Sequence, residues 1–366
     1  MHVTFSSMQE KHIQNLEAFL ARTGVLIRQI RTIRPPSVPG NEPLHHELAQ
    51  EFSRRLNALG NGRTYLVVDH TTDNLSDWDG LVDCMTEKHA SLTGSNDNNQ
   101  FCPSMEMAYE DFEYFREPGC QRMTEDHGLA DNVFLITPQS PEACQDLLFS
   151  AVLLTDMFRM AKQNVLFLED YARITLYHEG FGHGTEPNWL LDGFGGNNTT
   201  NQEMRADIAS MAGILRDGAS IKTAHAIIHL RNLSSLRQTA LHADASQLTA
   251  SRMGGNELKI ALKDLEATPN LTSMPDTELV KTIDRIARPL MLDEPGFARR
   301  VQTLEDSLTL VRDTLNGEDE TCMRLAEENP ERLDRAISFL QDCMEAHALF
   351  LRPENKCKAP TPKVAP

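Results

Sequence analysis

Three features are scarce or missing in this sequence of 366 residues, and each absence excludes a class of protein. No stretch approaches the run of about 18 apolar residues that marks a membrane-spanning helix, and the start, MHVTFSSMQEKH, lacks the apolar core of a signal peptide. Basic residues are outnumbered, since 35 Lys and Arg stand against 53 Asp and Glu and give a net charge of −18. Nucleic-acid backbones and anionic lipids both require a basic surface. We therefore expect neither a nucleic acid nor a membrane among the partners.

Cysteine is also sparse and shows no pairing in the sequence. The seven cysteines are an odd number, and none forms a CxxC pair. Neither a disulfide framework nor a cysteine-based zinc site is therefore expected. Such thiols are typical of a reducing compartment, so we expect a cytoplasmic protein, with export that needs no N-terminal signal left open. The pattern does not indicate an oligomeric state.

The first part of the chain mixes helices with strands. Apolar residues recur at helical spacing over residues 1–34, and the prolines of RPPSVPGNEP end that helix. A second helix is predicted from residues 41–42 through LHHELAQEFSRRLNAL, closed by Gly60. Two short β-branched stretches, RTYLVVDHTT and NVFLIT, are predicted to be strands, and DFEYFREPGCQRMTEDHG between them is predicted to be irregular.

From Pro141 onward the pattern is almost entirely helical. PEACQDLLFSAVLLTDMFRMA and NVLFLEDYARITLYHE are apolar helices, and EMRADIASMAGILRDG carries one apolar stripe. Further helices are predicted to about residue 350. The expected fold is mainly α (α+β): an N-terminal α+β part over residues 1–140, a helical domain over 141–352, and a disordered tail over 353–366.

The stretch YHEGFGHGTEP places two histidines five residues apart, with Glu179 directly after the first. The familiar zinc-peptidase pattern, HExxH, has four-residue spacing, which puts both histidines on one helical face. Five residues on an ideal helix turn about 500°, so the side chains of His178 and His183 would diverge by about 140°. One extra residue inserted as a π-bulge restores the shared face, and Gly180 and Gly182 make that distortion easy. The spacing therefore predicts a metal site on a π-distorted helix.

A third ligand is predicted on the next helix. Glu203 begins the apolar-striped helix 20 residues after His183, and Asp207 follows one turn later on the same face. Zinc in hydrolases takes three protein ligands and a water molecule, and a nearby carboxylate commonly orients a ligating histidine. We expect His178, His183 and Glu203 to ligate, Asp207 to orient a histidine, and Glu179 to act as general base.

The two motifs resemble those of a known family. HEGFGH followed by QEMRAD resembles the HExxGH and EExRA[ED] motifs of dipeptidyl peptidase III, a family of zinc exopeptidases. The resemblance implies the ligands and general base named above and one Zn²⁺ per chain, with Gln202 in place of the first glutamate of the EE pair. A third stretch, TAHAIIHLRNL, resembles the family's AHxxAR helix, whose histidine helps to stabilise the transition state. That histidine corresponds to His225.

The resemblance extends over residues 170 to 235 only. The loop between the two motifs is much shorter than in the classical enzymes, and the chain is about half their length. The second lobe, which helps to hold the peptide's N-terminus in those enzymes, has no counterpart that we recognise here. A hydrolase is therefore implied, whereas dipeptide release is not.

Several residues near the motifs have more than one possible role. His225 can donate a hydrogen bond to a developing oxyanion, or it can pair with His229 as an independent metal site, or it can simply face the core. Tyr177 can be a second oxyanion donor or a core residue. Arg205 can bind a substrate carboxylate or a neighbouring acid.

The sequence thus predicts a helical zinc-metallopeptidase-like domain that acts on a peptide or a small amide. Zinc-activated water would attack the carbonyl, with Glu179 as base and His225 or Tyr177 at the oxyanion. The alternatives are a zinc hydrolase of a non-peptide amide or ester, and a non-catalytic, metal-stabilised binding protein.

Overall fold

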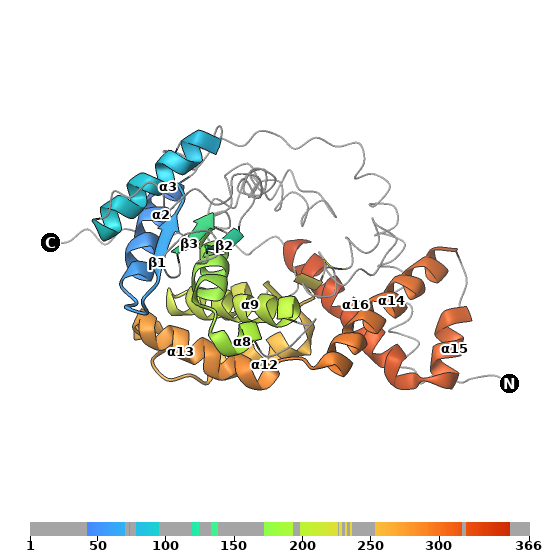
Figure 1. Ribbon diagram of the computed structural model, residues 1–366. Helices are drawn as coiled ribbons and strands as arrows, with labels where there is room; N and C mark the ends of the chain where they lie inside the picture. The colour runs from blue at the N-terminus through green and yellow to red at the C-terminus, as the bar shows by residue number, and fades with distance from the viewer. Residues whose placement is uncertain are drawn as a thin grey trace.

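The computed structural model describes residues 42–69, 73, 78–94, 119–123, 133–137, 172–192, 198–225, 227–228, 231–232, 235, 253–316 and 320–351. The helices predicted for residues 1–34 and 141–161, and the tail at 353–366, lie outside these ranges. The strands are β1 (Thr64–Val67), β2 (Gly119–Met123) and β3 (Val133–Thr137). The α-helices are α2 (Glu42–Asn57), α3 (Trp78–Thr93), α8 (Asn188–Asp192), α9 (Asn198–Arg216), α12 (Gly255–Glu266), α13 (Asp276–Ala287), α14 (Glu294–Asn316), α15 (Glu320–Glu328) and α16 (Pro330–Leu351). The expectation of a mainly helical protein is confirmed (Figure 1).

The three strands form one sheet in the order β1-β3-β2. β1 runs parallel to β3, with Tyr65 opposite Phe134, and β2 runs antiparallel to β3, with Cys120 opposite Ile136. Both predicted strands are present. The prediction that residues 111–128 are irregular is wrong for residues 119–123, because β2 forms there as an edge strand. Its sequence, GCQRM, has no β-branched residue, so pairing with β3 rather than local propensity makes it a strand.

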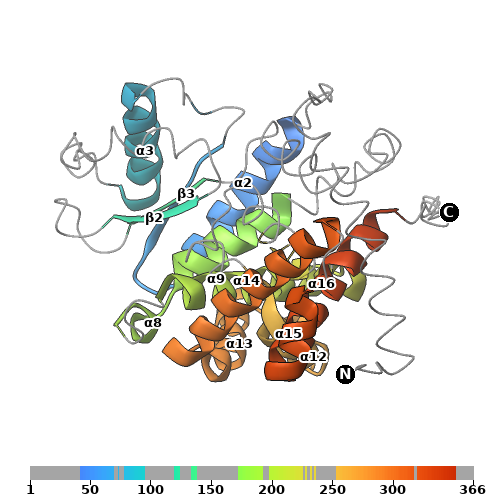
Figure 2. The same ribbon diagram turned by 90° about the vertical axis from the view of Figure 1, so that its right-hand side faces the viewer.

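Helix α2 packs on the sheet with the face that its sequence predicts. Leu48, Phe52 and Leu56, spaced by four residues, are fully or almost fully buried. After the helix, Gly60 adopts φ +65, the left-handed conformation that a glycine terminator requires. The Asn57 amide then pairs with strand β1, because its nitrogen donates to the Tyr65 carbonyl at 2.9 Å and its oxygen accepts from the Tyr65 N–H at 3.0 Å. Figure 2 shows the sheet lying between α3 and the layer formed by α2 and α9.

Helix α9 lies at the centre of the molecule (Figure 1). Its predicted stripe is confirmed, since Met204, Ile208 and Met211 are buried and Leu215 packs against the core. One hydrophobic cluster joins residues of α2, β1 and β3 with residues of α9, α12 and α13. The parts of the chain before and after the expected boundary at residue 140 therefore share one core.

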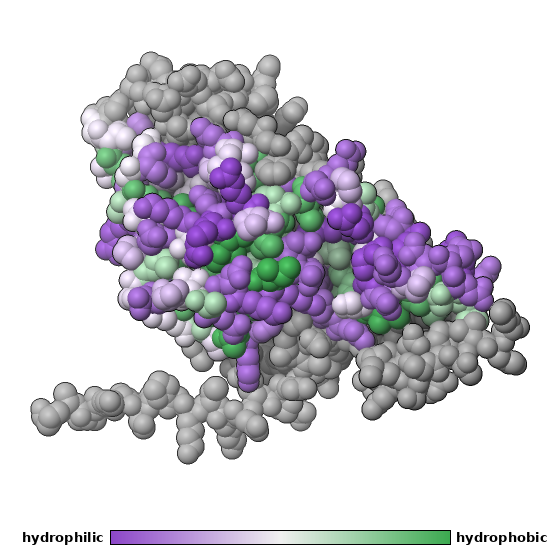
Figure 3. Space-filling model, turned by 90° about the horizontal axis from the view of Figure 1, so that it is seen from below, coloured by the Kyte–Doolittle hydropathy of each residue, from purple (hydrophilic) through white to green (hydrophobic). Residues whose placement is uncertain are grey.

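The C-terminal helices α14, α15 and α16 enclose a second hydrophobic cluster beside the first (Figure 1). The two regions are tied by polar contacts, because Lys259 of α12 pairs with Asp342 of α16 at 2.6 Å and Arg300 of α14 pairs with Glu257 of α12 at 2.8 Å. None of the described helices combines the length and the apolarity that a membrane span requires. Seen from below, the surface is mostly hydrophilic, with a small hydrophobic patch near its centre (Figure 3).

Gly213 of α9 tests how closely the central helix packs. A Cβ atom added there would lie 2.2 to 2.4 Å from three ring atoms of Tyr177, so either the ring or the helix would have to move. We expect Gly213→Ala to lower the free energy of unfolding by about 1 to 3 kcal/mol, measured by urea denaturation. Thr199→Ala, at an exposed position of the same helix, should change it by less than about 0.5 kcal/mol. Equal stability of the Gly213 variant and the wild type would contradict this packing.

Candidate metal centre

The histidine motif lies on a π-helix, as its spacing predicts. The chain is α-helical over residues 172–176, becomes the π-helix η5 (Tyr177–Gly182), and tightens into the 3-10 turn η6 (His183–Thr185). The wider π turn brings the rings of His178 and His183 together, with centroids 4.9 Å apart. The proposed distortion of the helix is therefore confirmed.

Both glycines of the motif allow close packing, and Gly182 also adopts an unusual backbone conformation. A Cβ on Gly182 would lie 2.6 Å from Cα and 2.7 Å from Cβ of Ala206, so only glycine lets the π-helix touch α9. A Cβ on Gly180 would lie 2.9 Å from a methyl group of Leu56 on α2. Neither glycine is among the described residues with positive φ. Gly182 nevertheless lies at φ −80 and ψ −90, outside the α-helical region, so the backbone freedom expected from the sequence is used there, and close packing is a second requirement.

The three predicted ligands converge. Ligand atoms of His178, His183 and Glu203 all lie within 4.8 Å of one another. Nε2 of His178 is 3.4 Å from one oxygen of Glu203, and Nε2 of His183 is 3.9 Å from the other. Zinc with bonds of about 2.1 Å in tetrahedral geometry requires ligand atoms about 3.4 Å apart. Two imidazoles and one carboxylate in this arrangement fit a zinc ion with one position left for water.

Each histidine is oriented by its own buried carboxylate. Nδ1 of His178 is 3.1 Å from Asp207, which was predicted to orient one of the histidines, and Nδ1 of His183 is 2.7 Å from Glu186. Gln202 donates to the second oxygen of Glu186 at 2.8 Å. Burial lowers the pKa of His183 and the hydrogen bond with Glu186 raises it, with a net increase. Because a carboxylate engages Nδ1 of each histidine, both rings present Nε2 to the cluster, which is the geometry that a ligating imidazole needs.

Opposing effects act on the charge of His178. Burial and the neighbouring Arg231 lower its pKa, but hydrogen bonds with Asp207 and Glu203 and the charge of Glu179 raise it to about 10. Burial raises the pKa of Glu203, whereas the hydrogen bond with His178 and the nearby cations bring it well below its usual value. Glu203 is therefore a carboxylate at neutral pH. Because an imidazole ligates only through a deprotonated nitrogen, protons compete with a metal for His178.

Arg205 binds the backbone of the distorted turn. Its guanidinium is fully buried and donates to the carbonyls of Phe181 at 3.3 Å, Gly182, and Thr185 at 3.2 Å. Its Nε donates to Asp284 of α13 at 2.8 Å. Of the two readings of Arg205, the structure therefore selects the neighbouring acid. The hydrogen bonds from Arg205 to the backbone carbonyls were not predicted, because no sequence pattern indicates which arginine will bind the backbone of a π-helix.

A second arginine supports the other side of the turn. Arg63, which precedes β1, donates to the carbonyl of Gly184 at 2.9 Å and to that of Glu186 at 2.7 Å. These bonds hold the segment that carries Glu186, and Glu186 in turn orients His183. Arg63, at the start of the sheet, therefore helps to position His183 through Glu186.

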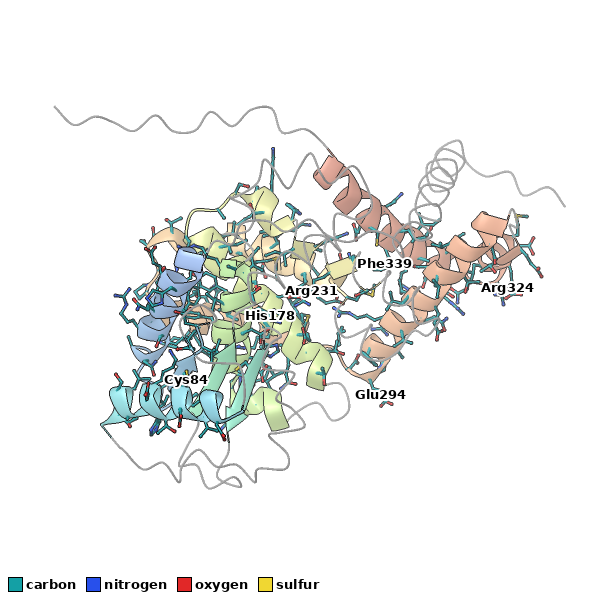
Figure 4. All side chains as sticks on the ribbon, turned by 90° about the horizontal axis from the view of Figure 1, so that it is seen from above. Cys84, His178, Arg231, Glu294, Arg324 and Phe339 are labelled. Carbon is teal, nitrogen blue, oxygen red and sulfur yellow. The ribbon has the colours of Figure 1, made fainter. Side chains whose placement is uncertain are left out.

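Sequence reasoning also missed Arg231, which touches the cluster from a third segment. Nη2 of Arg231 lies 2.7 Å from Asp207, 3.5 Å from Glu203 and 3.2 Å from both ring nitrogens of His178. Equal distances to both nitrogens place this atom over the face of the ring, since an in-plane position would collide with Cε1. Figure 4 shows His178 and Arg231 side by side near the middle of the molecule. One signal was present in the sequence, namely a basic residue in the TAHAIIHLRNL stretch that carries the family resemblance.

Tyr177 does not fit the oxyanion role. Its ring is fully buried, and its hydroxyl donates to Asp217 at 2.7 Å while it accepts from Arg55 at 2.9 Å and from Arg216 at 2.6 Å. Both arginines also bind Asp276 of α13. The proton of the hydroxyl is directed at Asp217. The hydroxyl joins Arg55 of α2 to Arg216 of α9, and the two arginines extend the network to Asp276 of α13. The core alternative for Tyr177 is therefore the one that the structure supports.

The other two predicted catalytic residues, Glu179 and His225, differ in burial. Glu179 is buried on η5, and its charge contributes to raising the pKa of both His178 and His183, so its carboxylate lies near both rings. His225 is exposed on the helical segment that begins at residue 221, and its role stays a prediction. His229 lies outside the described residues, so the alternative of a second histidine pair stays open.

Comparison of the chain with protein-family models, with curated proteins and with solved structures found no match. What the site can do is therefore argued from its own geometry.

The paired carboxylates make a testable contribution to metal affinity. Asp207→Asn and Glu186→Gln each leave a neutral partner at Nδ1 of a histidine, so each should weaken Zn²⁺ binding by about 10- to 100-fold, measured by competition with a chromophoric chelator. Glu278→Gln, at an exposed position on α13, is the matched control and should bind zinc like the wild type. Unchanged affinity in the Glu186 variant would limit that residue to shaping the turn.

Proposed function

We propose that this protein is a zinc-dependent hydrolase that cleaves peptide bonds. The observation that carries the proposal is the convergence of His178, His183 and Glu203, whose ligand atoms lie within 4.8 Å of one another. Supporting it, each histidine has its Nδ1 bound by a separate carboxylate, Asp207 or Glu186. The match of HEGFGH and QEMRAD to the motifs of dipeptidyl peptidase III agrees with this assignment.

The proposed roles follow from the positions of the residues. A zinc ion held by the three ligands would polarise the scissile carbonyl and acidify a water molecule. Glu179, buried one residue after His178, accepts the proton of that water and passes it to the leaving amine. His225 is the proposed donor to the oxyanion, as the third motif implies. Tyr177 is not part of this proposal, because its hydroxyl is engaged by Asp217 and two arginines.

The general base distinguishes the proposal from a binding protein. A site that only stabilised a fold would need the three ligands and their orienting carboxylates, and it would have no use for an acid beside them. Glu179 ligates nothing in the cluster, yet it is buried, which is unfavourable for a carboxylate without a task. This favours an enzyme. A substrate screen distinguishes cleavage of a peptide from cleavage of another amide or of an ester.

The ligand assignment predicts about one zinc ion per chain in the purified protein, by elemental analysis. His178→Ala, His183→Ala and Glu203→Ala should each lose it, because two ligands cannot retain the ion against a chelator. His225→Ala should keep the full amount, since this exposed histidine lies outside the ligand set. If the Glu203 variant keeps its zinc, the third ligand is elsewhere, with Asp207 and Glu186 the next candidates.

The general-base assignment predicts that Glu179→Gln retains both zinc and fold but loses activity. Glutamine matches the size of glutamate and cannot accept a proton, so hydrolysis in a screen of short peptides, amides and esters should fall by at least about 100-fold. His225→Ala should slow turnover by less. Glu266→Gln, at an exposed position, serves as the matched control. Turnover by the Glu179 variant at the wild-type rate would mean that another group activates the water, and a wild type inactive on all three substrate classes would support the binding-protein alternative.

A further inference from the structure

Arg231 stands in an unusual place for a cation. Its Nη2 lies 3.2 Å from Nε2 of His178 and 3.5 Å from Oε2 of Glu203, and these two atoms are the ones that face each other in the ligand set. Zinc binds such atoms at about 2.0 to 2.2 Å. An ion held there would therefore come within a few ångströms of the guanidinium. Arginine keeps its charge under all ordinary conditions, so the two cations repel each other.

The charge of Arg231 also has a clear counterpart. Two carboxylates of the cluster, Asp207 and Glu203, form ion pairs with it, and Asp207 is buried. Arg205, by contrast, is paired with Asp284 of α13, and Arg63 donates to backbone carbonyls of the turn. Arg231 therefore balances negative charge that a divalent cation at the same ligands would otherwise balance.

We propose that Arg231 is a resident competitor of the metal, which lowers the affinity of the His178, His183 and Glu203 site for divalent cations. This inference rests on the metal site of the proposed function and adds to it a residue that sets how firmly the ion is held. Two effects act in the same direction. Removal of the guanidinium relieves the repulsion between like charges, and it also leaves Asp207 to act on His178 alone, which makes the imidazole a stronger ligand.

The alternative role for Arg231 has the opposite sign. If the guanidinium acts mainly by fixing Asp207 and Glu203 in position, its removal loosens two groups that the metal needs, and affinity falls. Bonds from both Nε and Nη2 of Arg231 to the same oxygen of Asp207 would serve such a positioning role. The direction of the change in zinc affinity therefore separates the two roles.

The experiment compares zinc affinity in four proteins stripped of metal: the wild type, Arg231→Gln, Arg231→Lys and Lys222→Gln. Competition with a chromophoric chelator gives each dissociation constant for Zn²⁺. A quarter of the Arg231 side chain is exposed, so solvent screens part of its charge, and we expect Arg231→Gln to bind zinc only about 10-fold more tightly than the wild type. Arg231→Lys, which keeps the charge, should stay close to the wild type. Lys222→Gln removes one positive charge from an exposed position nine residues earlier in the chain and should change nothing, since solvent screens it.

A thermal readout accompanies the affinities. Without Arg231 the buried Asp207 loses a cationic partner, so the metal-free Arg231→Gln protein should melt below the wild type, and saturating Zn²⁺ should remove most of the difference. If Arg231→Gln does not fold, Arg231→Met replaces it in both measurements, because methionine keeps an aliphatic side chain and removes the charge.

Equal or weaker zinc binding by the charge-removing variants would overturn the inference, and weaker binding would make Arg231 a positioning residue. That result would leave the proposed function intact. Absence of zinc binding by the wild type and by every Arg231 variant would instead overturn the metal site itself, and the inference with it.

Discussion

A π-helix leaves backbone carbonyls without the partners that an α-helix would give them, and in this chain the guanidinium of Arg205 supplies those partners. It is fully buried and donates to the carbonyls of Phe181, Gly182 and Thr185, which flank and include the turn where the π-helix tightens. Arg205 lies two residues after Glu203 on α9, so the same helix that provides the third ligand also holds the turn that carries the second. One segment therefore meets both requirements, and this stabilises the five-residue spacing of the histidines.

Charge balance is the second constraint on the site. Asp207, Glu186 and Glu179 are all buried around the histidines, and a carboxylate is rarely buried without a partner. A separate network balances charge around Tyr177. In it, Arg55 and Arg216 both bind Asp276 and both donate to the tyrosine hydroxyl. The cations for these pairs come from α2, α9 and the segment after residue 221, so the electrostatic balance joins segments that are far apart in the sequence.

The features that were predicted correctly are those that depend on spacing along one segment. The stripe of α9 and the π-distortion follow from a count of residues against the 3.6-residue turn, and the end of α2 follows from the glycine beside it. Glu203 and Asp207 followed in the same way, as an i, i+4 pair after the histidines.

The features that were missed depend on contacts between segments. Strand β2 exists because β3 pairs with it, and nothing in GCQRM favours a strand. Arg231 reaches the cluster from a third segment. Tyr177 was given a possible catalytic role because its hydrogen bonds with Arg55 and Arg216 join distant segments and cannot be deduced from the sequence. Glu186 is an intermediate case, since its i, i+3 spacing from His183 is visible in the sequence, but only Asp207 was assigned the role of orienting a histidine.

The site also differs from metal centres that create their own fold. In a zinc finger the ligands have no fixed arrangement until the ion binds, so the binding free energy is the folding free energy. Here the close approach of Gly182 to Ala206 fixes η5 against α9 through backbone contact, and the stripe of Met204, Ile208 and Met211 anchors α9 in the main core. His183 and Glu203 are therefore brought together by packing, and their geometry is available before any ion arrives. A centre of this kind can release its metal without unfolding, which is the condition under which a cationic side chain such as Arg231 can adjust affinity rather than stability.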